Sequence, residues 1–319
     1  MNISPLTRRQ VLAGGVAGVG ALLTPWKVGA AASTVPAAAS GTVGVGGDLR
    51  VNRLGFGAMR ITGPGIWGAP KDPAEARRVL HRALDLGVNF IDTADAYGPM
   101  VSELLIAETL YPYPRGLVIA TKGGLVRPGA SEWTPDGRPA HLREACEASL
   151  KRLRLERIDL YQFHRIDPNV PLEESLGEFA RLQKEGKIRH VGVSNFNVEE
   201  LTRARKVVPV VSVQNRYNVS DRTSEDVLAL CAREGIAFIP WAPLASGSSE
   251  RLERDASGQR LEALAKTRGV GVLQLAIAWL LTKSPAMLPI PGTSSVEHLN
   301  ENVAAAQLQL TAGEMTLIG

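Results

Sequence analysis

Eight short apolar segments between residues 51 and 306 are each followed by a segment whose apolar residues recur at helical spacing. The composition does not change between these units, so they belong to one domain. Because an open sheet of eight strands would leave edges to protect, the pattern predicts a closed (β/α)8 TIM barrel. A small hairpin across the barrel floor is expected before the first strand. The expected strands lie within residues 51–58, 88–91, 117–120, 158–163, 188–193, 210–213, 236–240 and 287–290.

A doubly wound open sheet is the rival architecture. It would carry Gly-x-Gly-x-x-Gly between an early strand and the following helix. Gly55-Phe-Gly57 lacks both the third glycine and the helix, so the barrel is favoured.

The first helix shows how clearly the sequence marks element ends. Asp72 is the expected N-cap, Pro73 lies in the first turn, Glu75 completes a capping box, and Gly87 ends the helix. A loop rich in Gly, Pro and Trp extends to Pro139 and is long enough to be a functional excursion. The other expected helices occupy residues 102–110, 141–153, 172–184, 198–206, 224–234, 259–267, 272–282 and 295–306.

Residues 1–40 are predicted to be a twin-arginine signal and linker, with the barrel domain at 41–319. Arg8 and Arg9 precede a weakly apolar run at residues 11–24, and the alanine-rich stretch before Ser33 suits cleavage. This order predicts passage through the twin-arginine translocase to the periplasm. The apolar run is too short and too glycine-rich for a stable membrane span. The alternative is a disordered extension of a cytoplasmic protein. Residues 35–47, rich in Ala, Gly and Ser, are expected to be linker.

The charge balance argues against a nucleic-acid partner. The net charge is +4, but Arg8, Arg9 and Lys27 lie in the first 32 residues, which leaves about +1 on the rest. Cys146 and Cys231 fall inside expected amphipathic helices and are predicted to be buried free thiols. His and Cys never cluster at metal-ligand spacing, so no metal site is expected.

Four expected strands run directly into polar side chains. The second ends in Asp92 with Tyr97 five positions later, the third ends in Lys122, the fourth in His164, and the fifth in Ser194 and Asn195. Taken singly, such residues are mostly surface or structural residues. Together, at the carboxyl ends of barrel strands, they predict an active site. Asp95 and Asp167, although close in sequence, are interpreted as loop residues without a chemical role.

This set of residues resembles the aldo-keto reductase family. The resemblance covers about residues 54–303 and rests on Asp92, Tyr97, Lys122, His164, Ser194-Asn195, Gln214, Trp241-Ala-Pro-Leu244 and Ile290-Pro-Gly-Thr293. It implies a barrel enzyme that reduces aldehydes and ketones reversibly with NADPH. The implied roles are a proton donor for Tyr97 (a base in the oxidising direction), tuning for Lys122 and Asp92, and orientation of the carbonyl for His164.

The chemistry of these side chains is consistent with the implied roles. A carbonyl oxygen that becomes an alkoxide needs a proton, and a tyrosine with a pKa near 10 is a poor acid in neutral water. A lysine ammonium within a few ångströms should lower that pKa, and Asp92 would keep Lys122 charged and fixed. His164 would hydrogen-bond the carbonyl and orient it.

The resemblance also implies how the dinucleotide lies across the barrel mouth. Ser194, Asn195 and Gln214 match carboxamide contacts, Trp241 matches an aromatic that stacks on the nicotinamide ring, and the adjoining segment follows the pyrophosphate. An ordinary core aromatic is the alternative for Trp241. The residues implied along the pyrophosphate are Ala242, Leu244 and Ser246.

The start of the last helix is the predicted site of the adenosine 2′-phosphate. Free N–H groups at a helix start bind anions, and Gly292, Thr293 and Ser294 precede this helix. Gly292 and His298 stand where family members often have lysine and arginine, and a plain Ser/Thr cap is the alternative. NADPH is nevertheless favoured over NADH. The resemblance points to Glu301 and Asn302 as adenine contacts.

The substrate is predicted only as a small-molecule carbonyl of modest size, with sugar-like compounds among the candidates. The short segment after Trp241 and the chain end at Gly319 favour an open pocket lined from residues 61–67, Trp133 and Tyr217. Two other functions stay open at this point. One is a non-turnover, redox-sensing nicotinamide-binding subunit like the potassium-channel β subunits, and the other is a lyase or isomerase. The oligomeric state is not predicted.

Overall fold

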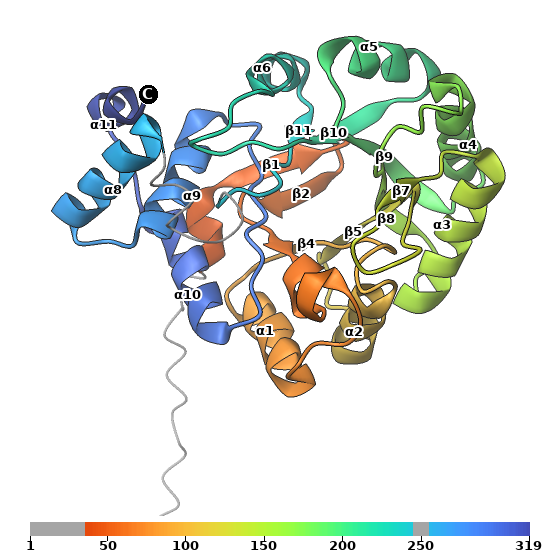
Figure 1. The fold of residues 1–319 in the computed structure, drawn as a ribbon, viewed down its shortest axis with the longest axis horizontal. Coiled ribbons are helices and arrows are strands. Elements are labelled where there is room, and N and C mark those ends of the chain that lie inside the picture. Colours follow the sequence, from red (N-terminus) through yellow and green to blue (C-terminus); the bar gives the residue numbers. More distant parts are fainter. Residues whose placement is uncertain (1–35, 245–254) are drawn as a thin grey trace, which may run out of the picture. The chain divides into compact units, whose positions relative to one another are not determined.

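A computed structural model describes residues 36–244 and 255–319 (Figure 1). By its contacts the chain divides into two units, residues 1–33 and 34–319. The predicted twin-arginine signal lies outside the described residues. The second unit is the barrel.

Seven strands form one parallel sheet, in the order β11-β10-β9-β8-β5-β4-β3. Every neighbouring pair is parallel, as βα units require. Their carboxyl ends therefore meet at one mouth. The strands are β3 (Phe56–Gly57), β4 (Phe90–Asp92), β5 (Val118–Gly123), β8 (Ile158–Phe163), β9 (Ile188–Ser194), β10 (Val210–Gln214) and β11 (Ala237–Phe238).

The eighth strand, predicted at residues 287–290, does not form a regular ladder. Only an isolated bridge joins Met287 to Phe238. The segment still closes the ring of strands. The Leu288 N–H donates to the Phe238 carbonyl at 2.8 Å, and the Gly55 N–H donates to the Pro289 carbonyl at 2.9 Å. Pro289 and Pro291 have no N–H to donate, which explains why the segment is extended but poorly paired.

The helices follow the strands in the predicted order, and Figure 1 shows α1 to α6 outside the strands. A short C-terminal helix, α11, was not predicted. Thr311 and Glu314 form its capping box, and it packs on α8. The helices are α1 (Pro73–Asp85), α2 (Val101–Leu110), α3 (Pro139–Leu153), α4 (Leu172–Lys184), α5 (Val198–Val207), α6 (Glu225–Glu234), α8 (Ala256–Arg268), α9 (Val272–Lys283), α10 (Val296–Ala304) and α11 (Ala312–Ile318).

An antiparallel hairpin of β1 (Thr42–Val45) and β2 (Leu49–Asn52) closes the floor of the barrel. Val45, Leu49 and Val51 are buried in one cluster with strand residues from inside the barrel. Val51 therefore belongs to the predicted hairpin and not to the first barrel strand.

The expected linker at residues 35–47 is wrong from Pro36 onward. A 3-10 helix, Pro36–Ser40, precedes the hairpin, and its Ala37 is fully buried and donates its N–H to Leu86 at 3.1 Å. Small residues such as alanine are common in linkers, but they also suit close packing, as Ala37 shows against the end of α1. The barrel unit thus starts before residue 41.

Asp72 caps α1 as predicted, accepting the Glu75 N–H at 2.9 Å. The reciprocal half of the capping box is absent. The Glu75 carboxylate instead accepts the Val296 N–H at 2.9 Å and pairs with Arg78. It thereby satisfies an N–H at the start of α10, far away in sequence.

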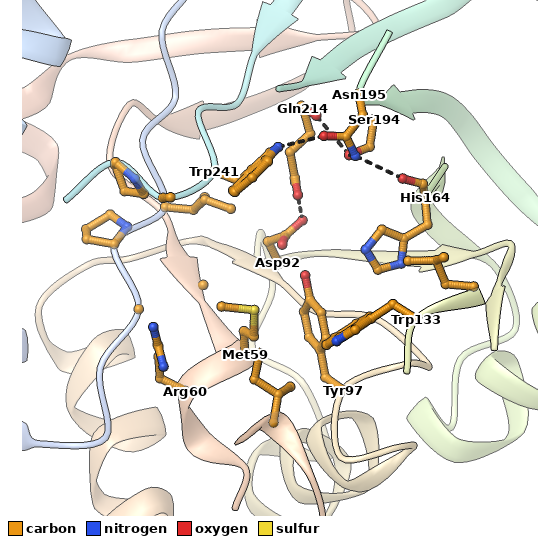
Figure 2. A pocket seen from close by; sticks show the side chains of 18 of the residues that line it. Met59, Arg60, Asp92, Tyr97, Trp133, His164, Ser194, Asn195, Gln214 and Trp241 are labelled. Carbon is orange, nitrogen blue, oxygen red and sulfur yellow. Dashed lines mark hydrogen bonds between the residues drawn. The ribbon is translucent and has the colours of Figure 1, made fainter. Parts of the chain in front are cut away.

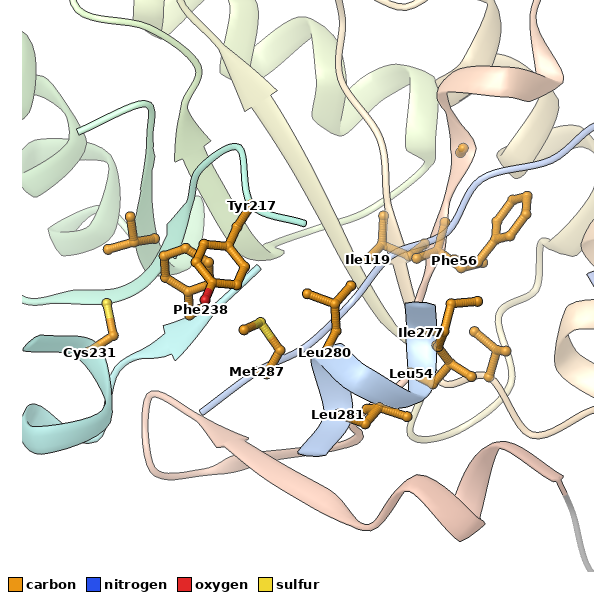
Figure 3. Close-up of a cluster of buried hydrophobic side chains, with 14 of the residues drawn as sticks. Leu54, Phe56, Ile119, Tyr217, Cys231, Phe238, Ile277, Leu280, Leu281 and Met287 are labelled. Carbon is orange, nitrogen blue, oxygen red and sulfur yellow. The ribbon is translucent and has the colours of Figure 1, made fainter. Parts of the chain in front are cut away.

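The main apolar core fills the space between strands and helices (Figure 3). Leu54, Phe56 and Ile119 from the barrel side pack with Ile277 and Leu280 of α9 in this cluster. Cys146 and Cys231 are buried and unbonded, as predicted.

Within the described part of the chain, no single helix is long and apolar enough to cross a membrane. The pair α8 and α9 meets the length and composition criteria only together, across a bend of 109°. Residues 275–281 of α9, all apolar, are buried in the core just described.

Candidate active site

A cavity of about 480 Å³ lies at the carboxyl ends of the strands and is called here the mouth cavity (Figure 2). Side chains from the ends of β4, β8, β9, β10 and β11, and from the loops that follow them, reach it. Asp92, Tyr97, His164, Ser194, Asn195, Gln214 and Trp241 all line it. The structure therefore brings three of the four predicted catalytic residues and seven of the predicted cofactor contacts to this cavity. The other three of these cofactor contacts are Ala242, Leu244 and Gly292.

Tyr97, Lys122 and Asp92 form a continuous buried chain. The Lys122 ammonium donates to the Tyr97 hydroxyl at 3.2 Å, to Asp92 Oδ1 at 2.6 Å and to the Thr93 carbonyl at 2.8 Å. Lys122 has no exposed surface. Its three donors are therefore all used, and its position is fixed.

Both oxygens of Asp92 are occupied, and this was not predicted. Gln162 and Gln214 donate their side-chain amides to Asp92 Oδ2 at 2.9 and 2.8 Å. Gln162 lies two residues before His164 in β8, so alternation along the strand was the signal that could have revealed it. Gln214, predicted only as a carboxamide contact, also holds the carboxylate.

Burial outweighs the lysine in setting the acidity of Tyr97. Burial raises the pKa of the Tyr97 phenol and Lys122 acts to lower it, but the net pKa lies above the usual value of 10. Lys122 thus acts on the pKa of Tyr97 in the predicted direction, but the prediction that this pKa falls below its usual value is wrong. Burial also acts to lower the pKa of Lys122, yet Asp92 and Tyr97 hold it above 10.5. At neutral pH the phenol keeps its proton and the ammonium its charge.

His164 is neutral at neutral pH. Burial, and after it the charges of Lys122 and Arg165, hold the pKa of its imidazole well below 6.5. The ring lies edge-on to Tyr97, with centroids 5.9 Å apart. Its buried Nδ1 has no hydrogen-bond partner in the described ranges. A neutral imidazole retains one N–H, which suits it to donate to a carbonyl.

Trp241 and Asn195 form the opposite wall of the mouth cavity. The Trp241 indole donates to Asn195 Oδ1 at 2.9 Å, and Asn195 Nδ2 donates to Ser194 Oγ at 3.0 Å and to the His164 carbonyl at 3.3 Å. Asn195 and Ala242 both have left-handed backbones, with φ of 62° and 49°. Such conformations are costly for residues with a Cβ and concentrate at ligand sites.

The predicted anion site at the start of α10 is largely satisfied by the chain itself. The Ser295 N–H donates to Thr293 Oγ1 at 3.1 Å, and the His298 N–H donates to Ser295 Oγ at 3.4 Å. Glu75 accepts the Val296 N–H, as described above. The prediction of free N–H groups is therefore wrong for these three residues, and the Ser/Thr cap is present.

Gly292 cannot be replaced by a longer residue without a shift of the backbone. A Cβ at this position would collide with the carbonyl oxygen of Gly57. The close approach of Gly57 is therefore compatible with glycine here, where members of the family often have a lysine. Gly292, Ala242 and Leu244 line the mouth cavity, whereas Thr293, His298, Glu301 and Asn302 do not. Ser294 lines a neighbouring cavity of about 330 Å³, and Ser246 lies outside the described residues.

The rest of the mouth cavity is apolar and aromatic on one side. Ile66 and Trp133 line it as predicted, together with Met59 and Leu125. Tyr217 was predicted wrongly. It is fully buried, its hydroxyl donates to Glu225, and its ring stacks on Trp279.

Asp95 and Asp167 lie in loops, as interpreted from the sequence, but their carboxyl groups are enclosed by the protein. Asp167 is buried and accepts the N–H groups of Gly137 and Asn169, both at 2.9 Å. Burial and the nearby Glu103 raise the pKa of Asp95 to about 8. Its Oδ1 is buried and has no partner within residues 36–244 and 255–319. Over the same residues, no three His, Cys, Asp or Glu side chains gather as a metal site requires.

Comparison with known proteins accords with this geometry. The sequence pattern of the aldo/keto reductase family matches residues 53–319. The chain belongs to the aldo/keto reductase family. Members of this family are NAD(P)H-dependent oxidoreductases that act on carbonyl groups. This aldo/keto reductase has the (β/α)8 barrel of its relatives.

Curated and solved relatives cover nearly the whole barrel. An uncharacterised oxidoreductase of Schizosaccharomyces pombe is 53% identical over 283 residues, 89% of this chain and 90% of the relative. Pyridoxine 4-dehydrogenase of Escherichia coli is 41% identical over 271 residues, 83% and 93% of the two chains. The crystal structure of an aldo-keto reductase from Klebsiella pneumoniae in complex with NADPH superposes with a TM-score of 0.73 at 28% identity, covering 87% and 93%.

Proposed function

We propose that this aldo/keto reductase transfers a hydride reversibly between NADPH and a carbonyl carbon, with Tyr97 as the proton donor during reduction. The observation that carries the proposal is the buried chain from the Tyr97 hydroxyl through Lys122, at 3.2 Å, to Asp92, at 2.6 Å. Tyr97 and Asp92 line the mouth cavity, and the hydroxyl is the proton source that the chemistry needs.

Tyr97 is suited to give up its proton only when charge develops beside it. Its pKa is raised by burial, so the phenol is protonated at neutral pH. When the carbonyl oxygen becomes an alkoxide, that oxygen is the stronger base and takes the proton. Lys122 already donates to the phenol oxygen and stabilises the phenolate that is left. In the oxidising direction the same phenolate removes the proton of the alcohol.

His164 orients the substrate. Its imidazole is neutral, so its single N–H donates to the carbonyl oxygen without competing as an acid. The rings of His164 and Tyr97 lie edge to face with centroids 5.9 Å apart, and we expect one substrate oxygen to accept a hydrogen bond from each of them. The carbonyl carbon is then held in one orientation.

The residues of the wall formed by Trp241 and Asn195 fit a nicotinamide dinucleotide. NADPH, when bound there, supplies the hydride. Trp241 offers a flat aromatic face, Asn195 and Ser194 offer amide and hydroxyl groups, and Ala242 brings its strained backbone to the same cavity. The NADPH-bound relative from Klebsiella pneumoniae supports NADPH over NADH. Further proposed contacts are Gln214, Leu244, Ser246, Gly292, Thr293, Ser294, His298, Glu301 and Asn302.

We propose pyridoxal as the first substrate to test, reduced to pyridoxine. The relative named pyridoxine 4-dehydrogenase supports this choice. The Met59, Ile66 and Trp133 side of the mouth cavity suits a planar ring. Arg165 also lines the cavity next to His164, where a cation suits the phenolate oxygen adjacent to the aldehyde of pyridoxal.

The test is reduction of pyridoxal by wild type and Tyr97→Phe, followed as loss of NADPH absorbance. The variant should lose about 10²-fold or more in kcat while still binding NADPH. Near wild-type turnover in Tyr97→Phe would remove tyrosine from the mechanism. Turnover of other aldehydes with none of pyridoxal would remove only the substrate assignment.

We also propose that the predicted twin-arginine signal, which precedes the barrel unit, directs export to the periplasm. The support is the order of Arg8, Arg9, an apolar run and an alanine-rich stretch. Cell fractionation of the native chain and of an Arg8→Lys, Arg9→Lys variant tests the proposal. Equal distribution of both proteins in the cytoplasm would contradict it.

A further inference from the structure

Arg127 is a buried arginine that takes no part in the chemistry described above. It follows β6 (Leu125–Val126), which pairs with β7 (Thr134–Pro135) as a hairpin in the excursion before α3. Arg127 is 8% exposed. No carboxylate pairs with it within residues 36–244 and 255–319, so backbone and aromatic groups alone offset its charge.

The guanidinium joins three loops at the barrel mouth. One nitrogen donates to the Ile66 carbonyl at 3.2 Å and to the Ala96 carbonyl at 3.1 Å. The other donates to the Ala130 carbonyl. These partners lie in the loop after β3, the loop after β4 and the tip of the hairpin. None lies in a barrel strand.

The same guanidinium stacks on Trp133, with its central carbon 3.6 Å from the ring centroid, and lies 5.4 Å from the Trp67 ring. Trp133 in turn meets the Tyr97 ring edge-on at 6.5 Å. Figure 2 shows Trp133 beside Tyr97 in the mouth cavity.

The residues held in this way are those of the substrate side of the cavity. Ile66 and Trp133 line it directly, and Ala96 immediately precedes Tyr97. The residues proposed for the cofactor, Trp241 and Asn195, have no contact with Arg127 among its hydrogen bonds and aromatic partners. Arg127 therefore contacts the separate segments of the substrate side of the cavity and does not contact Trp241 or Asn195 on the cofactor side.

We propose that Arg127 is a positioning residue that sets substrate specificity by fixing the Trp133 ring. Trp133 is the group that contacts a planar substrate, and Arg127 acts through it. The inference rests on the proposed function for its kinetic readout but not for its structural one. A planar guanidinium can stack and donate in two directions at once, which a lysine cannot do.

The experiment compares Arg127→Met, Arg127→Lys, Trp133→Ala and the Arg127→Met, Trp133→Ala double variant. In Arg127→Met we expect KM for pyridoxal to rise on the order of tenfold, with kcat and NADPH affinity changed less than about twofold. Arg127→Lys should behave like Arg127→Met. In the Trp133→Ala background, Arg127→Met should add less than about twofold to KM, because the group through which it acts is gone.

Acrylamide quenching of tryptophan fluorescence in the cofactor-free protein is the second readout. Arg127→Met should increase quenching clearly more in the wild-type background than in the Trp133→Ala background, where only Trp67 remains beside residue 127. Arg138→Met is the matched control, since Arg138 lies in the same excursion but is exposed and bonded to Asp136 at 2.6 Å. It should change neither readout.

Additive effects on KM, full rescue by lysine, or an equal loss of NADPH affinity would overturn the proposal. If wild type turned over neither pyridoxal nor any other aldehyde, the proposed function would fail. The quenching comparison would then still decide whether Arg127 holds Trp133.

Discussion

Replacement of Lys122 by methionine tests the core of the site, because Lys122 touches both Tyr97 and Asp92. The substitution keeps the aliphatic length of the side chain and removes the ammonium. Asp92 would then be a buried carboxylate, 1% exposed, with only the amides of Gln162 and Gln214 as partners. Removing one partner of a buried ion pair costs about 3–5 kcal/mol.

Such a loss is large compared with the ~5–15 kcal/mol by which proteins of this kind are stable, so the variant should fold but melt earlier. A second substitution separates stability from catalysis. In the Asp92→Asn, Lys122→Met variant the buried charge is gone, and most of the lost unfolding free energy should return. The rate should not return, because no cation faces the phenol. We expect a loss of about 10²–10⁴-fold in kcat in both variants.

The pH dependence of alcohol oxidation gives an independent readout. Lys122 lowers the pKa of Tyr97, so its removal must raise that pKa further above the usual value. Oxidation needs the phenolate, and its rate should therefore rise only at higher pH in Lys122→Met than in wild type. Urea unfolding, steady-state reduction of pyridoxal and the pH–rate profile together measure the three effects.

Lys187→Met is the matched control for the ion pair. Lys187 also lies 2.6 Å from a carboxylate, that of Glu147, but both side chains are partly exposed. It should lose much less stability than Lys122→Met and no activity. Wild-type kcat in Lys122→Met, or equal destabilisation by the two substitutions, would refute the reasoning.

Three further predictions concern groups around the site and in the core. Gln162→Leu removes one amide donor from Asp92 and should lower the unfolding free energy by about 1.5–3 kcal/mol, measured by urea unfolding. In steady-state kinetics it should change kcat more than it changes KM. An unchanged kcat would contradict the positioning role. Asp95 keeps its proton in the folded state up to pH about 8 but loses it near 3.8 when unfolded, so its stabilisation is present below 3.8 and lost as pH rises through this window. The unfolding free energy of Asp95→Asn, measured by urea unfolding, should therefore rise relative to that of wild type by up to about 1.4 kcal/mol per pH unit across the window. A pH-independent difference between the two unfolding free energies would count against the burial of this carboxyl. Burial raises the pKa of Cys146 and Cys231 to about 12, so both thiols should react with an aromatic disulfide reagent only in denaturant, and rapid reaction of the native protein would show them to be accessible.

The sequence was most informative where local pattern and position on the barrel act together. Seven of the eight predicted strands and all nine predicted helices have a counterpart close to the predicted residues, because each carries its own apolar spacing and end signals. Asp92, Tyr97, Lys122 and His164 were predicted to meet because parallel strands share one mouth. Family membership, also predicted, is confirmed by the match over residues 53–319.

Four of the failures depend on contacts between segments far apart in the chain. The Glu75 carboxylate caps a second helix instead of its own, which no local rule reveals. Gln162 was not predicted, because an amide in a strand becomes important only when a buried carboxylate lies opposite it. The net pKa of Tyr97 depends on how completely the phenol is buried, and burial cannot be read from spacing. Arg127 likewise gains its partners only when three loops converge.

The hairpin of β1 and β2 has a kinetic consequence. Because Val45, Leu49 and Val51 close the far end of the barrel, the cofactor and the substrate both enter and leave through the opposite end. When two ligands share one entrance, the ligand that binds deeper must bind first and dissociate last. Product-inhibition patterns should therefore show a compulsory sequence of arrival and departure, and not a random one.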